Sequence, residues 1–247
     1  MQTRQAALTD VGRKREHNED FHGIAGEAGV WVVADGMGGH AAGETASRLT
    51  VERFLAVLTL PGSYEGERSE GVPAAGLALA LAVTDANDTV RETGFADRNL
   101  RGMGTTVVAL VTRGGETVIG NVGDSRAYLL RKGALTLLTE DHSLVQEEIR
   151  AGTLSVARAR TVGYRNVITR AIGMDSEVSP DLVTLEPAPG DRVLLCSDGL
   201  NTMLEDSEIG PLLGLGTIEE AARHLVDRAN EAGGDDNITV LIVEWFE

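Results

Sequence analysis

Hydrophobic residues along the chain form short runs separated by turn residues, together with a few longer segments of helical period. The short runs are rich in Val and Ile, and most end against Gly, Asp or Asn, so they predict β-strands. These predicted strands cover residues 30–34, 105–112, 117–122, 127–130, 193–196 and 238–243. Short turns join most of them, and Arg131-Lys132-Gly133 predicts a hairpin over Tyr128 to Leu138, so we expect largely antiparallel sheets.

Longer segments with apolar residues near a 3.6-residue period predict helices over 44–58, 77–92 and 217–232, with a shorter one over 143–151. The third starts with Thr217 and has Glu220 three residues later, which is a capping-box pattern. Residues 61–76 are rich in Gly, Ser, Pro and Glu and predict a mobile connection between two helices. No repeat or break in composition divides the chain, so we expect a single domain over 1–247, an α+β sandwich.

The chain of 247 residues has 22 Lys and Arg against 38 Asp and Glu, a formal net charge of −16. This charge argues against nucleic acid and anionic membranes as partners. The acids could serve solubility alone, or some of them could converge on hard cations. No stretch approaches the roughly 20 apolar residues of a membrane span, and no signal peptide is recognisable, so we expect a cytoplasmic protein.

Cys196 is the only cysteine, which excludes an internal disulfide and a zinc cage built on cysteines. It lies within the apolar run 193–196, so we interpret it as a buried strand residue and not as a nucleophile.

Aspartates stand at the ends of four predicted strands, each beside glycine or another turn residue. They are Asp35, Asp124, Asp198 and the pair Asp235-Asp236, and a further acidic pair occurs at Glu19-Asp20. Each junction alone is explained by an ordinary turn. If the strand ends meet at one rim, however, two carboxylates 4 Å apart repel by about 4 kcal/mol at an effective dielectric of 20. Such a cluster must bind protons or cations, and oxygen ligands favour Mg²⁺ or Mn²⁺.

The order of these motifs resembles the metal-dependent protein phosphatases of type 2C, and specifically their compact bacterial members. The resemblance runs nearly end to end through 9–12, Arg15, 18–20, 33–40, 103–106, 121–126, 139–143, 165–170, 196–200 and 235–239. It implies two antiparallel sheets packed face to face with helices on both outer sides, a four-layer αββα sandwich. It also implies a flap at about 143–172 beside the site.

The resemblance further implies two divalent cations, Mn²⁺ or Mg²⁺. In this pattern Asp35 bridges both metals, and the carbonyl of Gly36 contacts the second. Asp198 and Asp236 complete the first metal. The catalytic residues implied are thus Arg15, Asp35 and Asp198, with Arg15 gripping the substrate phosphate.

Three further acids have counterparts in the family. Glu19 and Asp20 correspond to acids that reach the second metal directly or through water, and Asp124, with Asp198, to the site of a third, weaker metal. The implied reaction is direct attack of a metal-bridging water on phosphoserine or phosphothreonine in proteins. The partners would be phosphorylated proteins, in opposition to a Ser/Thr kinase, and we expect a monomer.

One position departs from many eukaryotic members, which carry His directly after the Asp-Gly pair as a proposed general acid. Here it is Met37, and His40 follows three residues later, either as an acid or in a structural role at a helix start. The alternative function is a catalytically silent, metal-binding regulatory module of the same fold. Arg158, Arg160 and Arg165 in the flap either dock acidic or phosphorylated segments or are simply solvated.

Overall fold

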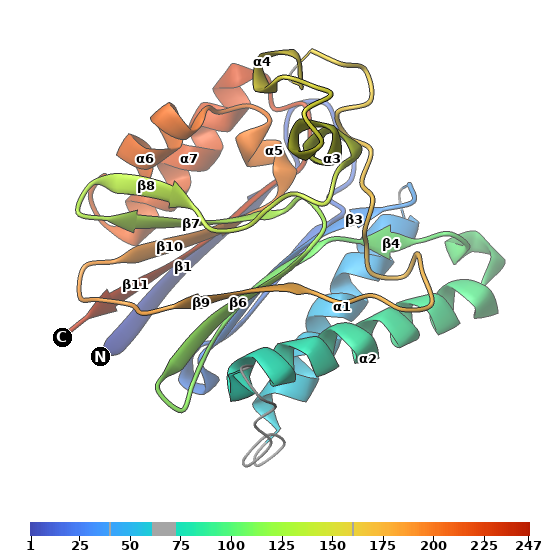
Figure 1. Cartoon of the computed structure of the whole chain (residues 1–247), viewed down its shortest axis with the longest axis horizontal. Helices are drawn as coiled ribbons and strands as arrows, with labels where there is room; N and C mark the ends of the chain where they lie inside the picture. The colour runs from blue at the N-terminus through green and yellow to red at the C-terminus, as the bar shows by residue number, and fades with distance from the viewer. Residues whose placement is uncertain (40, 61–72, 160) are drawn as a thin grey trace.

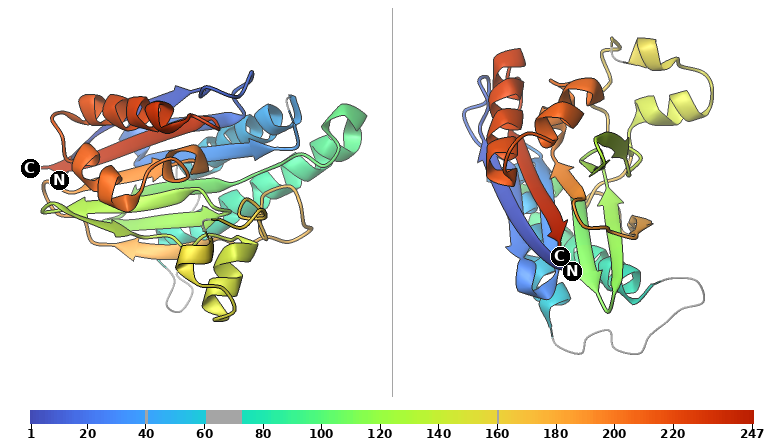
Figure 2. Two further views of the ribbon diagram at one scale, coloured as in Figure 1. Left: turned by 90° about the horizontal axis from the view of Figure 1, so that it is seen from above. Right: turned by 90° about the vertical axis from the view of Figure 1, so that its left-hand side faces the viewer.

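Two β-sheets lie face to face at the centre of the protein, and helices cover the outer side of each (Figures 1 and 2). The structure is a computed structural model, and it describes residues 1–39, 41–60, 73–159 and 161–247. The named strand pairs all run antiparallel. The predicted four-layer αββα sandwich is therefore confirmed.

The first sheet has five strands in the order β1-β11-β10-β7-β8. Their bounds are β1 Gln2–Asp10, β7 Arg126–Arg131, β8 Ala134–Leu137, β10 Arg192–Cys196 and β11 Ile238–Phe246. Lys132 and Gly133 join β7 to β8 with φ of 52° and 80°. Two positive φ values match a two-residue hairpin turn, so the hairpin predicted at this point is confirmed.

The second sheet follows the order β2-β3-β5-β6-β9, with β4 paired to the end of β3. The bounds are β2 Asp20–Ala25, β3 Val30–Met37, β4 Gly104–Thr105, β5 Val107–Arg113, β6 Glu116–Val122 and β9 Asp181–Leu185. Side chains along β3 alternate between two cores. Trp31 and Val33 pack between the sheets, whereas Val32 and Ala34 pack against the outer helices.

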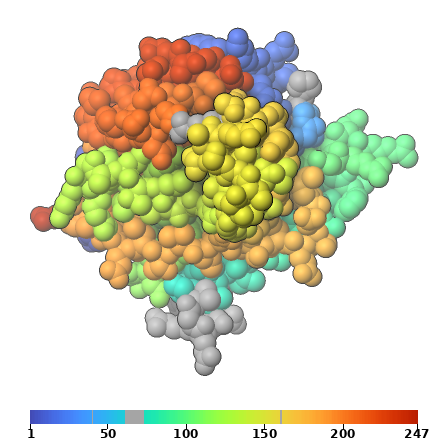
Figure 3. Space-filling view, turned by 45° about the horizontal axis from the view of Figure 1, so that its top comes forward, coloured from blue at the N-terminus to red at the C-terminus, as the bar shows by residue number. Residues whose placement is uncertain are grey.

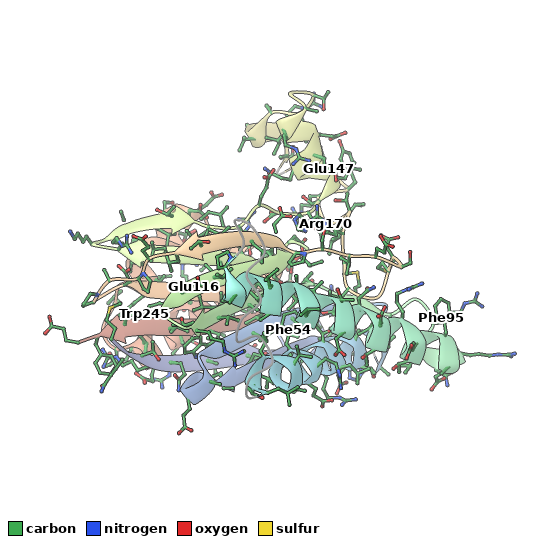
Figure 4. The ribbon with its side chains drawn as sticks, turned by 60° about the horizontal axis from the view of Figure 1, so that its bottom comes forward. Phe54, Phe95, Glu116, Glu147, Arg170 and Trp245 are labelled. Atoms are coloured by element: carbon green, nitrogen blue, oxygen red, sulfur yellow. The ribbon has the colours of Figure 1, made fainter. Side chains whose placement is uncertain are left out.

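Two groups of helices form the outer layers. Helices α1 (Ala41–Thr59) and α2 (Ala74–Ala96) cover the second sheet, and α5 (Asp198–Asn201), α6 (Asp206–Leu213) and α7 (Ile218–Ala232) lie over the first. Phe54 of α1 belongs to the outer core, while Trp245 of β11 belongs to the core between the sheets (Figure 4). The capping box predicted at Thr217 and Glu220 is present at the start of α7. Short 3-10 turns occupy Gly26–Ala28 and Arg98–Leu100.

A third segment stands apart from the layers and contains α3 (Leu144–Arg150) and α4 (Val156–Ala159). In the space-filling view it projects from the surface beside the α5–α6 segment (Figure 3). Both helices lie within the range of about 143–172 predicted for the flap. Residues 61–72 of the predicted connection lie outside the described residues. In the part of the chain that the structure describes, no helix combines the length and the apolar character needed to cross a bilayer.

Candidate active site

The acids at the strand ends converge at one rim of the sandwich, to which both sheets contribute. Asp20 opens β2 and lies directly opposite Asp35 of β3 in the strand register. Asp198 follows β10 as the first residue of α5, Asp236 stands two residues before β11, and Asp124 follows β6. Because the two sheets are face to face, residues 20, 35, 124, 198 and 236 meet from five strand ends.

Glycines next to two of these aspartates allow backbone segments to come very close. A Cβ on Gly36 would lie 2.1 Å from the carbonyl oxygen of Gly43 in α1, and one on Gly199 would lie 2.0 Å from that of Asn237. Any side chain at either position would therefore displace backbone. The glycines of the Asp-Gly pairs at 35–36 and 198–199 thus allow segments of the site to pack closely together. An ordinary turn does not require such close contact.

Asp20 is buried, with a relative exposure of 5%. Its Oδ2 accepts a hydrogen bond of 2.7 Å from the hydroxyl of Ser197, whereas its Oδ1 is buried without a hydrogen-bond partner. Burial, reinforced by the negative charges of Asp198 and Asp236, raises the pKa of Asp20 to about 7, although the hydroxyls of Ser197 and Thr239 oppose the shift. An oxygen so placed is available to a cation.

The neighbouring carboxyls raise one another's pKa values in the same way. Burial, followed by the charges of Asp20 and Asp198, holds the pKa of Asp35 well above its ordinary value. Burial and the charge of Asp236 raise the pKa of Asp198 to about 6, while a hydrogen bond with Asp35 lowers it. Burial and the charges of Asp198 and Asp141 raise that of Asp124 to about 8. The five aspartates therefore act as one electrostatic group.

The side chain of Glu19 makes different contacts from that of Asp20. Its carboxylate lies against the first turn of α1, where a Cβ on Gly43 would come within 1.8 Å of its Oε2. Its carbonyl oxygen accepts hydrogen bonds from the amide of Gly36 at 3.1 Å and from the hydroxyl of Ser47 at 2.6 Å. Glu19 thus joins β2 to β3 and α1 on the side of the rim that carries Gly36.

Arg15 reaches the rim from the loop between β1 and β2. Its Nη2 donates to Oδ2 of Asp236 at 2.7 Å, and half of its side chain remains exposed. Burial lowers the pKa of this guanidinium, but the charge of Asp236 and the hydrogen bond to it outweigh that effect and raise it overall. A guanidinium anchored at one edge and open to solvent at the other can bind phosphate oxygens.

The donor set fits hard divalent cations, because carboxylate and carbonyl oxygens are the ligands that Mg²⁺ and Mn²⁺ prefer. The unpartnered Oδ1 of Asp20 and the mutually raised pKa values both indicate a group that a cation would stabilise. Across residues 1–39, 41–60, 73–159 and 161–247, no three acidic, histidine or cysteine side chains close around a single point. The aspartates form an open rim, in keeping with Mg²⁺ sites, which retain several water ligands.

Other candidate residues can also be placed. Cys196 is buried in β10, and burial raises the pKa of its thiol to about 12, so the interpretation as an inert strand residue is confirmed. Met37 ends β3 and is half-buried, whereas His40 lies outside the described residues. Arg158 is exposed and Arg165 lines a cavity beneath the flap, while Arg160 is also outside the described residues.

Asn237 is a residue of the site to which sequence reasoning assigned no role. Its side chain is buried and binds the loop that carries Arg15 at three points. The Nδ2 group donates to the carbonyls of Val11 and His17, both at 2.9 Å, and Oδ1 accepts from the amide of Glu19 at 2.8 Å. Its place directly after Asp236 was the available signal, but its partners lie more than 200 positions away.

A second group that sequence reasoning missed holds the turn that carries Asp124. Arg126 makes a two-pronged ion pair with Asp141, at 2.8 and 2.6 Å, and also donates to the hydroxyl of Tyr128 at 3.0 Å. The residue after Asp141, His142, is buried, and its Nδ1 accepts a hydrogen bond of 3.0 Å from the amide of Gly123. These contacts fix the turn after β6 and connect it to the base of the flap.

Comparisons with known proteins find relatives that match nearly the whole chain. The family model described as Protein phosphatase 2C matches residues 11–240. The serine/threonine phosphatase stp of Listeria monocytogenes is 39% identical over 244 residues, which cover 96% of this chain and 93% of that protein. The crystal structure of the Mycobacterium tuberculosis serine/threonine phosphatase PstP/Ppp matches with a TM-score of 0.89 at 34% identity, and all of both chains is covered. The catalytic domain of PstP in complex with two manganese ions matches with a TM-score of 0.85 at 35% identity over 99% of each chain.

Proposed function

The chain belongs to the protein phosphatase 2C family, and we propose that the acids at its strand ends form the catalytic centre for hydrolysis of phosphoserine and phosphothreonine in proteins. It is a serine/threonine phosphatase that uses divalent Mn²⁺ or Mg²⁺. Its substrates are accordingly phosphorylated proteins. The observation that best supports the proposed centre is the rim of five mutually interacting aspartates beside the half-exposed Arg15.

Asp35 is opposite Asp20 in the strand register and hydrogen-bonded to Asp198. In this proposal Asp35, Asp198 and Asp236 would hold the first cation. Asp35 and the carbonyl of Gly36 would hold the second, with Asp20 and Glu19 reaching it directly or through water. Asp124 with Asp198 would hold a third, weaker ion. The bound cations would lower the pKa of a water molecule, which would act as the nucleophile, and would neutralise the negative charge of the phosphate oxygens.

The chain's own residues position the substrate. Arg15 holds phosphate oxygens through guanidinium nitrogens not used by Asp236, and Asn237 fixes the loop that carries it. Ser197 keeps the carboxylate of Asp20 oriented through their 2.7 Å hydrogen bond. No cysteine takes part, since Cys196 is buried and its thiol stays protonated. The proton for the leaving alcohol comes either from water in the site or from His40.

Four finer features belong to the same proposal. Residues 1–247 form one catalytic domain whose flap spans about 143–172. The phosphatase opposes a Ser/Thr kinase, acts as a monomer and works in the cytoplasm. Sedimentation analysis tests the monomer, cell fractionation tests the location, and reversal of a candidate kinase's phosphorylation tests the pairing.

Hydrolysis of a phosphothreonine peptide, with Mn²⁺ and after chelation, tests the proposed function. We expect turnover that requires the metal and is lost in Asp35→Asn, which keeps the shape of the side chain but removes its charge. Asp97→Asn, at the exposed C-terminus of α2, is the matched control and should retain activity. Folded protein without turnover on any phosphopeptide would instead favour a silent metal-binding module.

A further inference from the structure

A cavity of about 500 Å³ opens between the flap and the segment that begins with α5. Its size is within the roughly 300–1,000 Å³ range of ligand sites in proteins. The flap side contributes Val145, Ile149 and Val156, and the opposite side contributes Met203 and Leu204. These side chains form an apolar patch on each of the two facing walls, within a lining that is otherwise mostly polar. In Figure 3 the projecting flap lies next to the α5–α6 segment that forms the other wall.

The cavity reaches one side of the rim described above, because Asp124 and Asp198 also line it. A phosphorylated side chain at the rim would therefore place neighbouring residues of its own chain inside the cavity. Within the apolar patch Val156 is 62% exposed, whereas Val145 and Leu204 are buried at its edge.

The flap wall is held by specific contacts. Its two ends are tied together, since the amide of Leu144 donates to the carbonyl of Val167 at 2.9 Å and that of Thr169 donates to His142 at 2.8 Å. Within it, the hydroxyl of Tyr164 donates to Glu148 at 2.8 Å. Arg170 at its base, labelled with Glu147 of α3 in Figure 4, pairs with Asp181 at 2.6 Å.

We propose that this cavity receives an apolar side chain of the phosphoprotein substrate, located close in sequence to the phosphorylated residue. The proposal rests on the proposed function, since the phosphate must sit at the aspartate rim. The acidic residues that line the cavity, which include Glu205 and Asp206 at the start of α6, outnumber its two arginines, so an acidic substrate residue at this position is disfavoured. The phosphatase would thus select substrates by an apolar neighbour and not by charge alone.

A set of phosphothreonine peptides tests this selection. Every flanking residue is Ala, except that Leu is placed at one position at a time on either side of the phosphothreonine. We expect Leu at one position to raise kcat/KM at least about tenfold over the all-Ala peptide, because even one methylene in an apolar pocket is worth about that factor. Asp at the same position should lower it below the all-Ala value.

Variants of the wall identify where the preference arises. Val156→Asp changes an exposed side chain and Met203→Ala shortens one on the other wall, and both should reduce the ratio of kcat/KM between the Leu and all-Ala peptides towards one. Leu81→Asp, at a 49% exposed apolar position of α2 on the far side of the second sheet, should leave the ratio unchanged. Non-hydrolysable phosphonate peptides should show the same Leu preference in binding.

Equal kcat/KM for the Leu and Ala peptides at every position, with turnover intact, would overturn the cavity proposal alone. So would a preference that survives in both Val156→Asp and Met203→Ala. Absence of turnover on every peptide and on p-nitrophenyl phosphate would overturn the proposed function, and this outcome is distinct from the first two.

Discussion

Replacing Asn237 by Ala should release the loop that carries Arg15. The change removes three hydrogen bonds, two donated to the carbonyls of Val11 and His17 and one accepted from the amide of Glu19. At about 1 kcal/mol each, the loss in the free energy of unfolding is about 3 kcal/mol. For a chain of this size 1 kcal/mol corresponds to about 2–4 °C, so the melting temperature should fall by about 6–12 °C.

Thermal unfolding followed by circular dichroism measures this loss, and limited trypsin digestion locates it. Arg13, Lys14 and Arg15 are exposed in succession, so a loosened loop should be cut there earlier than in the unmodified protein. Asn99→Ala, at an exposed position of a 3-10 turn, is the control and should change the free energy of unfolding by less than about 0.5 kcal/mol. An Asn237→Ala variant with unchanged melting and unchanged cleavage would refute the anchoring role.

Three further predictions concern the rim. Arg15→Ala should raise KM for a phosphopeptide more than it lowers kcat, as steady-state kinetics would show; a loss in kcat alone would argue for transition-state stabilisation instead. Asp124→Ala should retain two tightly bound Mn²⁺ per chain in calorimetric titration and lose only a weaker third, and loss of all binding would contradict this assignment. The metal-free protein should lose stability as pH rises from 5 to 7. Burial raises the pKa of Asp20 to about 7 in the folded state, so the contribution of its proton to stability is full below the unfolded pKa of about 4 and is lost as the pH rises through about 7. One such proton is worth about 1.4 kcal/mol per pH unit, and Asp20→Asn should reduce the slope measured by thermal unfolding.

The strongly patterned elements were predictable from the sequence, and the weakly patterned ones were not. The apolar residues of β3, β6 and β10 form continuous runs in the sequence because these strands are buried on both faces. β1 was missed since it is a sheet-edge strand with mostly polar, half-exposed residues. α6 was missed as well, because Pro211 interrupts its pattern and its capping box uses Glu205 in place of Ser or Thr.

The residues of the site likewise divide into those that the sequence predicts and those that it does not. The aspartates could be found because each stands next to glycine or another turn residue at the end of an apolar run, and the family's motif order supplied their roles. Asn237, Arg126 and His142 could not be assigned functions in this way. Their importance lies in hydrogen bonds to backbone or to side chains brought close only by folding, such as the bond from Gly123 to His142. Local patterns carry no information about such partners.

In the proposed catalytic centre, the aspartate rim holds the divalent cations required for phosphoester hydrolysis. Anomalous diffraction at the manganese absorption edge, from crystals grown with Mn²⁺, tests it most directly. We expect two strong peaks among Asp20, Asp35, Asp198 and Asp236, and loss of both in Asp35→Asn. Peaks elsewhere on the protein, or a rim without peaks in crystals of protein shown to be active with Mn²⁺, would contradict it.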